Sequence, residues 1–146
     1  MIKRIIIFIF AFFSMLYSND LNMNAKFSNK IINKNKENYL ILSFISKNKI
    51  YLNFYPLLII KIEKQDWLKF PKDELKANDL DIDIFEFGNN KYINIKKPIK
   101  IPFELKKKYK KGKYFLILTV KGFYTIPDEN ITINFSKKKK IIYYIK

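Results

Sequence analysis

The fold is decided by the stretch Gly112-Lys-Tyr-Phe-Leu-Ile-Leu-Thr-Val-Lys-Gly-Phe-Tyr-Thr-Ile-Pro-Asp-Glu-Asn-Ile-Thr-Ile-Asn-Phe135, the most strongly patterned apolar segment after the N-terminus. Its many β-branched and aromatic residues favour extended structure. Near its middle, Pro127-Asp-Glu-Asn130 supplies residues typical of a turn. The stretch therefore predicts two β-strands joined by a short connection.

Further short segments with strand patterns lie on both sides of this stretch. Period-two alternation or a short apolar run predicts strands at 38–46, 50–56, 57–63, 79–87, 91–95, 98–105 and 141–145. In 79–87 we expect Leu80, Ile82 and Ile84 to face inward. No segment after residue 18 keeps a helical spacing for long. The pattern predicts an all-β protein, an antiparallel immunoglobulin-like β-sandwich of about seven or eight strands.

Polar and lysine-rich segments separate several of these strands. Residues 104–113 contain six lysines, and four more form the run Lys137–Lys140. We expect both to be solvated loops. Residues 65–78 are expected to form a longer connection, with Trp67 folded onto the end of the sandwich. The prolines at 98 and 102 favour an edge position for the strand at 98–105.

The first 18 residues have the pattern of an export signal. Lys3 and Arg4 precede an apolar stretch that reaches Tyr17, and this stretch is shorter than the roughly 20 residues that a membrane-spanning helix needs. We predict a signal peptide at 1–18, a polar N-terminal segment with at most a loose first strand at 19–37, and a β-sandwich domain at 38–146. An uncleaved N-terminal anchor is the alternative. Both place the remaining chain in the periplasm or outside the cell.

The chain is strongly basic. Its formal net charge is +16, which becomes +14 once Lys3 and Arg4 are removed with the signal. Arg4 is the only arginine, although arginine is the preferred residue for bidentate phosphate contacts. Lysine, isoleucine, asparagine, phenylalanine and tyrosine have AT-rich codons, so their abundance indicates an AT-rich bacterium. We therefore expect no nucleic-acid partner, whereas an anionic membrane surface or an acidic partner stays open.

The composition gives little support for an enzymatic function. The chain has no cysteine and no histidine, which removes thiol chemistry, histidine bases and Cys or His metal sites. Asp81 and Asp83 fit the solvent face of a strand better than a calcium loop. The pairs Ser46/Lys49 and Ser136/Lys139 have a spacing that chance explains in so lysine-rich a chain. We predict a protein that is not an enzyme, with no catalytic residue, cofactor or metal.

The order of elements from Asn38 to Phe135 resembles the amino-terminal periplasmic domain of the thiol-disulfide reductase DsbD and its immunoglobulin-like relatives. The matching motifs are the bend at 51–56, the strand at 58–63, Phe70-Pro71, Phe87-Gly88 with Tyr92, Ile101-Pro102-Phe103 and Gly112-Lys-Tyr114. The resemblance implies an immunoglobulin-like fold in the periplasm. In that family a cysteine pair follows the strand that corresponds to 114–120. The corresponding residues 121–130 contain no sulfur, so the resemblance does not extend to thiol exchange.

These observations favour an exported β-sandwich that binds another envelope protein, through an edge strand or through the loops at one end. The candidate interaction surface consists of Phe123, Tyr124, Ile126, Lys107, Lys108, Tyr109 and Lys110. One alternative is a basic protein that binds a membrane surface or another anionic ligand through its lysine-rich loops. A second alternative is a redox-inactive relative of the DsbD domain that docks on a thiol-oxidoreductase.

Overall fold

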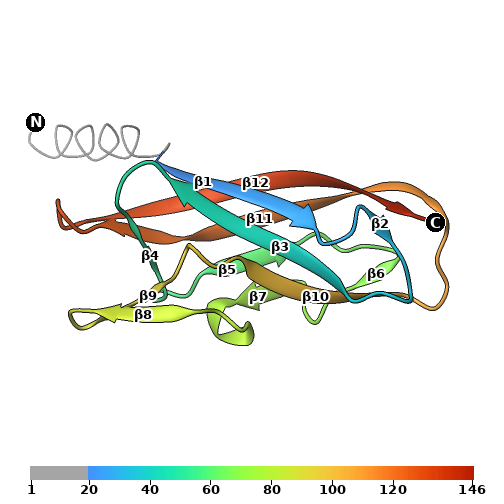
Figure 1. The fold of residues 1–146 in the computed structure, drawn as a ribbon, viewed down its shortest axis with the longest axis horizontal. Helices are drawn as coiled ribbons and strands as arrows, with labels where there is room; N and C mark the ends of the chain where they lie inside the picture. The colour runs from blue at the N-terminus through green and yellow to red at the C-terminus, as the bar shows by residue number, and fades with distance from the viewer. Residues whose placement is uncertain (1–19) are drawn as a thin grey trace, which may run out of the picture.

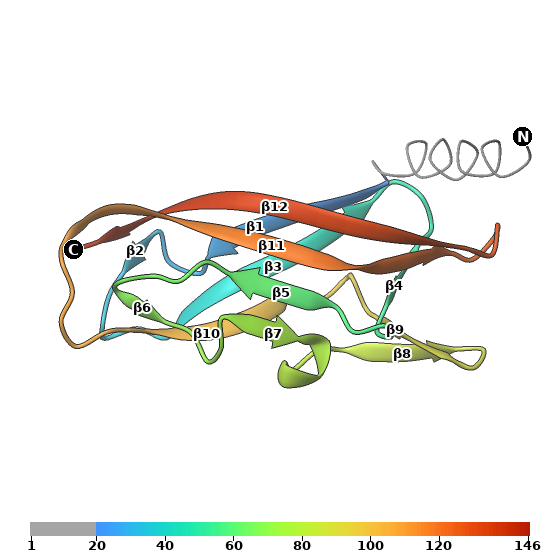
Figure 2. The same cartoon turned by 180° about the vertical axis from the view of Figure 1, so that it is seen from behind.

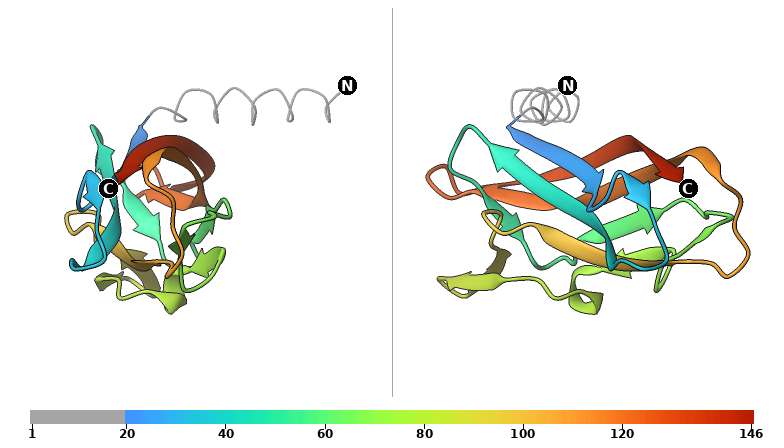
Figure 3. Two further views of the ribbon diagram at one scale, coloured as in Figure 1. Left: turned by 90° about the vertical axis from the view of Figure 1, so that its right-hand side faces the viewer. Right: turned by 45° about the vertical axis from the view of Figure 1, so that its right-hand side comes forward.

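The computed structural model describes residues 20–146, which form a β-sandwich. The predicted signal peptide at 1–18 lies outside the described residues. Within residues 20–146 there are twelve strands, one short 3-10 helix at Ala77–Asp79 (η1) and no α-helix. The two layers are visible in Figure 1 and, turned, in Figure 3. The predicted all-β fold class is confirmed, with more strands than expected because several are only two to four residues long.

The first sheet has four strands and lies in front in Figure 1. Their order is β1 (Leu21–Phe27), β3 (Asn38–Ser46), β10 (Ile99–Leu105) and β6 (Leu68–Lys69). β1 pairs antiparallel with β3 along its whole length, from Leu21 opposite Ser46 to Phe27 opposite Leu40. Ile99, Ile101 and Phe103 of β10 are buried at every second position. The predicted edge position of this strand is wrong, because β10 pairs with β3 on one side and with β6 on the other.

The second sheet is larger and faces the viewer in Figure 2. Its order is β2 (Ile31–Ile32), β12 (Ile131–Ile145), β11 (Gly112–Ile126), β4 (Tyr51–Asn53), β9 (Asn90–Ile93) and β8 (Ile84–Phe87). β5 (Ile59–Ile62) also pairs with β11, on the same side as β4, and β7 (Glu74–Lys76) pairs with β5. All pairings are antiparallel except the short parallel pairing of β2 with β12.

β11 and β12 form one long hairpin. The two 15-residue strands pair without interruption from Gly112 opposite Ile145 to Ile126 opposite Ile131, a length of about 50 Å. The predicted pair of joined strands is confirmed. The predicted loop at Lys137–Lys140 is wrong, because these lysines lie inside β12, opposite Val120 to Ile117.

Residues 20–37 of the predicted polar N-terminal segment belong to the sandwich rather than preceding it. They supply β1, whose Leu21, Met23 and Phe27 are buried, and the short strand β2. In β1 only every second residue is apolar, with asparagine or lysine between, so the segment looked polar as a whole. The connection at 65–78 likewise contains β6 and β7, which are too short to give a periodic pattern.

The strand predicted at 79–87 begins only at Ile84. Leu80 and Ile82 pack against the core from an irregular segment. The prediction that Ile84 faces inward is wrong, because its side chain is 41% exposed. Pairing of β8 with β9 determines which side chains of β8 face outward. The turn at Gly88, which has φ 61°, joins the two strands as expected.

The core lies between the two sheets and is rich in aromatic contacts. Phe27 of β1 packs against Tyr143 of β12 at 5.0 Å between ring centres, and Phe44 of β3 packs against Phe135 at 6.4 Å. The Tyr143 hydroxyl donates to Gln65 Oε1 at 2.8 Å, and burial raises its pKa to about 12. Trp67 is half-buried beside Tyr114, as predicted for an aromatic residue folded onto the sandwich.

Gly122 is the tightest position of β11. A Cβ there would lie 2.7 Å from Leu58 Cδ1 and 3.2 Å from the Phe135 ring. Leu58 is fully buried and has little room to move. We therefore expect Gly122→Ala to lower the free energy of unfolding by about 1–3 kcal/mol through overpacking, measured by urea denaturation.

A double-mutant cycle tests the cause. Leu58→Ala alone is expected to cost about 2–5 kcal/mol by leaving a cavity. The methyl group that Gly122→Ala introduces would occupy part of that space, so the double variant should lose less stability than the two single losses together. Additive losses would show that the contact with Leu58 is not the origin of the effect.

Candidate functional site

The apolar part of the predicted interaction surface is largely buried. Tyr124 and Ile126 are 1% and 6% exposed and belong to the core, whereas Phe123 lies half-buried on the outer face of β11. Successive side chains along β11 point to opposite faces of the sheet. The Tyr124 side chain therefore points into the core and that of Phe123 points away from it. Tyr124 and Ile126 are thus core residues and offer no contact surface to a partner.

The basic part lies at the other end of the sandwich. Lys107, Lys108, Tyr109 and Lys110 belong to the loop 106–111 that joins β10 to β11, as the predicted loop required. Lys34 Nζ lies 4.9 Å from the centre of the Tyr109 ring and donates to the Lys107 carbonyl at 3.2 Å. Nearly the whole of β11 separates this loop from Phe123 (Figure 1), so the structure does not bring the two parts together.

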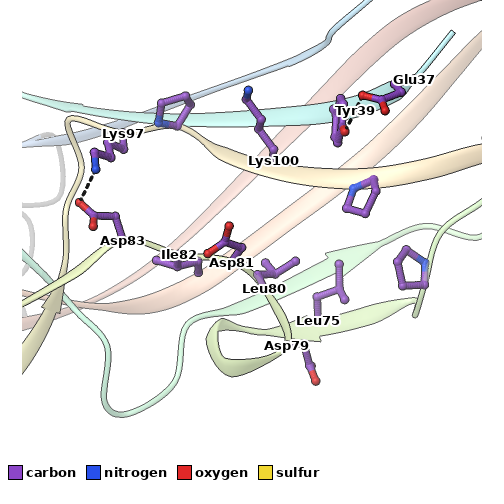
Figure 4. Close-up of a pocket in the computed structure, with 13 residues that line it drawn as sticks. Glu37, Tyr39, Leu75, Asp79, Leu80, Asp81, Ile82, Asp83, Lys97 and Lys100 are labelled. Atoms are coloured by element: carbon purple, nitrogen blue, oxygen red, sulfur yellow. Dashed lines mark hydrogen bonds and ion pairs between the residues drawn. The ribbon is translucent and has the colours of Figure 1, made fainter.

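A cavity of about 780 Å³ lies between β10 and the segment 79–83 (Figure 4). Its charged lining consists of Glu37, Asp79, Asp81, Asp83, Lys97 and Lys100. Leu75, Leu80 and Ile82 form the apolar part of its wall. This is the place where the acidic residues of a basic chain are concentrated.

Most of these carboxylates are already paired. Asp83 accepts a hydrogen bond from Asn94 Nδ2 at 2.7 Å and forms an ion pair with Lys97 at 3.3 Å. Asp79 accepts from Lys72 Nζ at 2.7 Å and from the Lys76 N–H at 2.9 Å. These partners lower the pKa of both carboxyl groups. The charges of Asp79 and Asp83 are thus held in local ion pairs.

Two features are not found in the described part of the chain. Among residues 20–146 there is no group of three or more acidic, histidine or cysteine residues placed to hold a metal ion. The same residues include no helix with the length and apolar character needed to cross a membrane.

The hairpin of β8 and β9 and the neighbouring strand β4 together carry a cluster of four aromatic rings, which we call the aromatic cluster: Tyr51 of β4, Phe85 and Phe87 of β8, and Tyr92 of β9. The Tyr51 ring lies 5.2 Å from Phe85, 5.3 Å from Phe87 and 5.1 Å from Tyr92. Tyr92 is buried by its neighbours, while Phe87 remains 56% exposed. The cluster thus presents an apolar surface at one end of the larger sheet.

β8 is the outermost strand of that sheet, and part of its backbone faces solvent. The Lys91 carbonyl accepts from the Phe54 N–H at 3.1 Å, on the side of β4. The Asn94 N–H donates to the Asp83 carbonyl at 2.8 Å. Because hydrogen-bonded and non-hydrogen-bonded pairs alternate in antiparallel strands, Ile84 and Glu86 direct their backbone groups away from β9. This edge has no strand partner among residues 20–146.

A second surface lies on the outer face of the β11–β12 hairpin. Phe115 and Ile142 are directly opposite each other, and each is 50% exposed. Lys140 Nζ lies 4.3 Å from the centre of the Phe115 ring. Lys138 follows on the same face of β12. We call these four residues the basic apolar face.

Comparison with known proteins gives little further information. No protein-family model matches the chain, and no curated protein does. One solved structure that matches is that of BcpA, the major pilin subunit of Bacillus cereus, at 14% identity and a TM-score of 0.37. The match covers 84% of this chain but 40% of the pilin chain.

Sequence reasoning missed both the aromatic cluster and the exposed edge of β8. Phe85 and Phe87 do alternate before the Gly88 turn, and this signal predicts a strand face shared by the two rings. Nothing in the local sequence, however, shows that Tyr51 joins them or that β8 ends the sheet.

The paired state of Asp83 can be tested by titration. Its folded-state pKa is lowered below the ordinary value of an aspartate carboxyl, first by the hydrogen bond from Asn94 and then by the one from Lys97. Stability from the ionised carboxylate is therefore present above the unfolded pKa and lost as pH falls through the folded pKa. We expect Asn94→Ala to raise the midpoint of the Asp83 carboxyl ¹³C signal. An unchanged midpoint would contradict the hydrogen bond as the main cause.

Proposed function

We propose that the chain is an exported, non-enzymatic β-sandwich that binds another envelope protein by accepting a strand of that protein along β8. The exposed edge of β8, with the aromatic cluster beside it, carries this proposal. An added strand gains main-chain hydrogen bonds from the outward groups of Ile84 and Glu86. Its side chains gain an apolar contact with Phe87, which is 56% exposed.

Other edges of the sandwich are less suited to strand addition. β10 lies between β3 and β6, and where β6 does not cover it, Pro102 has no N–H to donate. The exposed face of β1 carries asparagine and lysine, and β12 carries Lys137–Lys140. Lysine and proline at edges are common devices against unwanted pairing. β8 has the sequence Ile-Phe-Glu-Phe, with neither residue type.

The cellular setting of this proposal comes from the sequence. The basic start and the apolar stretch to Tyr17 support export to the periplasm or the cell exterior of an AT-rich bacterium. The resemblance to the amino-terminal domain of DsbD supports the same compartment. The same resemblance suggests one class of partner, a thiol-oxidoreductase. This chain has no cysteine and would bind such a partner without exchanging electrons.

Glu86→Pro tests strand addition directly. The Glu86 N–H faces solvent, so proline should leave the β8–β9 hairpin intact while removing one outward donor. A photo-crosslinking residue at Ile84 in living cells first identifies the partner, and the purified partner is then titrated. We expect Glu86→Pro to weaken binding about tenfold or more.

Two controls accompany this experiment. Glu86→Gln removes the same charge but keeps the N–H, and should bind almost as the original chain does. The crosslinker at Ile45, which is 61% exposed on the other sheet, should not capture the same protein. Equal capture at both positions, or equal binding by both Glu86 variants, would refute strand addition along β8.

The basic apolar face favours a second function, binding to an anionic membrane surface. Lysines beside exposed apolar side chains combine electrostatic attraction with burial of apolar area in the interface. Lys140 over Phe115, with Ile142 opposite, provides this combination. This differs from the sequence-based alternative, which assigned such binding to the lysine-rich loops.

Lys138→Gln/Lys140→Gln is expected to weaken binding to phosphatidylglycerol vesicles by roughly tenfold or more, since each lysine near a membrane contributes about 1 kcal/mol. Lys26→Gln/Lys36→Gln lowers the net charge equally but leaves this face unchanged, and should bind as the original chain does. Co-sedimentation at low and high salt measures both. Equal losses in the two double variants would show that net charge, not this face, governs binding.

A further inference from the structure

A polar cavity of about 380 Å³ lies beside the aromatic cluster. Its walls come from three segments that are distant in sequence: β4 with the residues after it, the β8–β9 turn, and the end of the β11–β12 hairpin. Figures 1 and 2 show the two turns at the same end of the molecule. The volume falls in the range of small-ligand pockets.

Neutral hydrogen-bonding groups dominate this cavity. Asn53, Asn89, Asn90 and Asn130 provide four side-chain amides, and Thr125 and Thr132 provide two hydroxyls. The lining contains no carboxylate. Lys91 is its single charged residue, and an ion pair of 3.9 Å with Glu86 offsets that charge. The lining therefore favours an uncharged polar ligand over an ion.

Part of the cavity is held in place by internal hydrogen bonds. The buried Thr125 hydroxyl donates to Asn53 Oδ1 at 2.8 Å and lies 3.1 Å from the Thr132 hydroxyl. Thr125 and Thr132 are also directly opposite each other in the hairpin. These bonds fix the floor of the cavity before any ligand binds, which reduces the entropy cost of binding.

The remaining amides have no such partner. The side chains of Asn89, Asn90 and Asn130 make no hydrogen bond with any residue of 20–146, although all three line the same cavity. Each amide offers two donor hydrogens and one acceptor oxygen. A ligand with neighbouring hydroxyl groups, each both donor and acceptor, matches this arrangement.

An exposed aromatic ring completes the site. Tyr55 lines the cavity and is 60% exposed. The Phe54 ring meets Tyr55 at 4.7 Å and an interplanar angle of 90°, which supports it from one side. The C–H faces of a sugar ring are apolar and stack on aromatic rings, while the hydroxyls around the ring form hydrogen bonds with side-chain amides. Side-chain amides together with an exposed tyrosine therefore fit a sugar better than a lipid or an anion.

We propose that this cavity binds a neutral carbohydrate, of one to three sugar units. Asn89, Asn90 and Asn130 hydrogen-bond its hydroxyls, and Tyr55 stacks against one ring. The site is distinct from the outward backbone groups of β8 and does not depend on the protein partner proposed above. A glycan of the cell envelope or of a host surface has the required chemistry.

The test uses the full chain with four neutral trisaccharides: maltotriose, cellotriose, galactotriose and N-acetylchitotriose. Saturation-transfer NMR at roughly 10 mM sugar detects the weak binding expected of single glycan sites. At least one sugar should receive saturation and shift the ¹⁵N side-chain amide signals of Asn89, Asn90 or Asn130.

Three variants locate the binding. Asn90→Ala and Asn130→Gly should each weaken binding about tenfold or more, because each variant removes one to two hydrogen bonds to the sugar. Glycine is chosen at 130 because Asn130 has φ 52°, which alanine tolerates poorly. Asn134→Ala removes an exposed amide from β12 outside the cavity and should leave binding unchanged.

Thermal unfolding of each variant confirms that it is folded. Absence of binding to all four sugars would overturn the proposal. Binding that Asn134→Ala weakens as much as Asn90→Ala does would also overturn it, as would binding of sulfated or sialylated trisaccharides alone. Glu86→Pro should retain sugar binding, so failure of the strand-addition proposal is distinguishable from failure of this one.

Discussion

One uninterrupted antiparallel pairing, that of β11 with β12, positions every other part of the larger sheet. β11 carries β12 on one side and both β4 and β5 on the other. Through β4 it also carries β9 and β8, which form the exposed end of the sheet. Its inward residues Leu116, Leu118 and Val120 are fully buried. Loss of pairing or packing in this strand would therefore disconnect the aromatic cluster and the polar cavity from the sandwich.

The lysine run shows how this hairpin combines stability with protection of an edge. Alternation puts Lys137 and Lys139 on the same side of β12 as Phe135 and Ile141. Their long aliphatic stems can lie along apolar surface while the charged ends reach water. Charged residues that point inward at a free edge hinder the addition of a further strand. The run thus disfavours addition of a further strand at β12, whereas β8 contains no lysine.

Sequence patterns predicted the long strands and failed where strands were short or charged. β3 was predicted with its observed bounds because Leu40, Leu42 and Phe44 recur at every second position. Lys137–Lys140 looked like a loop, yet Phe135 and Ile141 are separated by an even number of positions. That separation keeps both on one face and was the available signal for a continuous strand. The candidate sites depend on pairings between distant segments, which local patterns do not encode.

The aromatic cluster explains how a weakly paired hairpin stays attached. Only two residue pairs join β9 to β4, Leu52 with Ile93 and Asn53 with Tyr92. Tyr51 adds ring contacts to both strands of the hairpin and is itself paired with Thr125 of β11. Thr125 in turn holds Asn53 in the polar cavity. The edge of β8 and the floor of the cavity therefore share one structural support, and a change at Tyr51 would affect both.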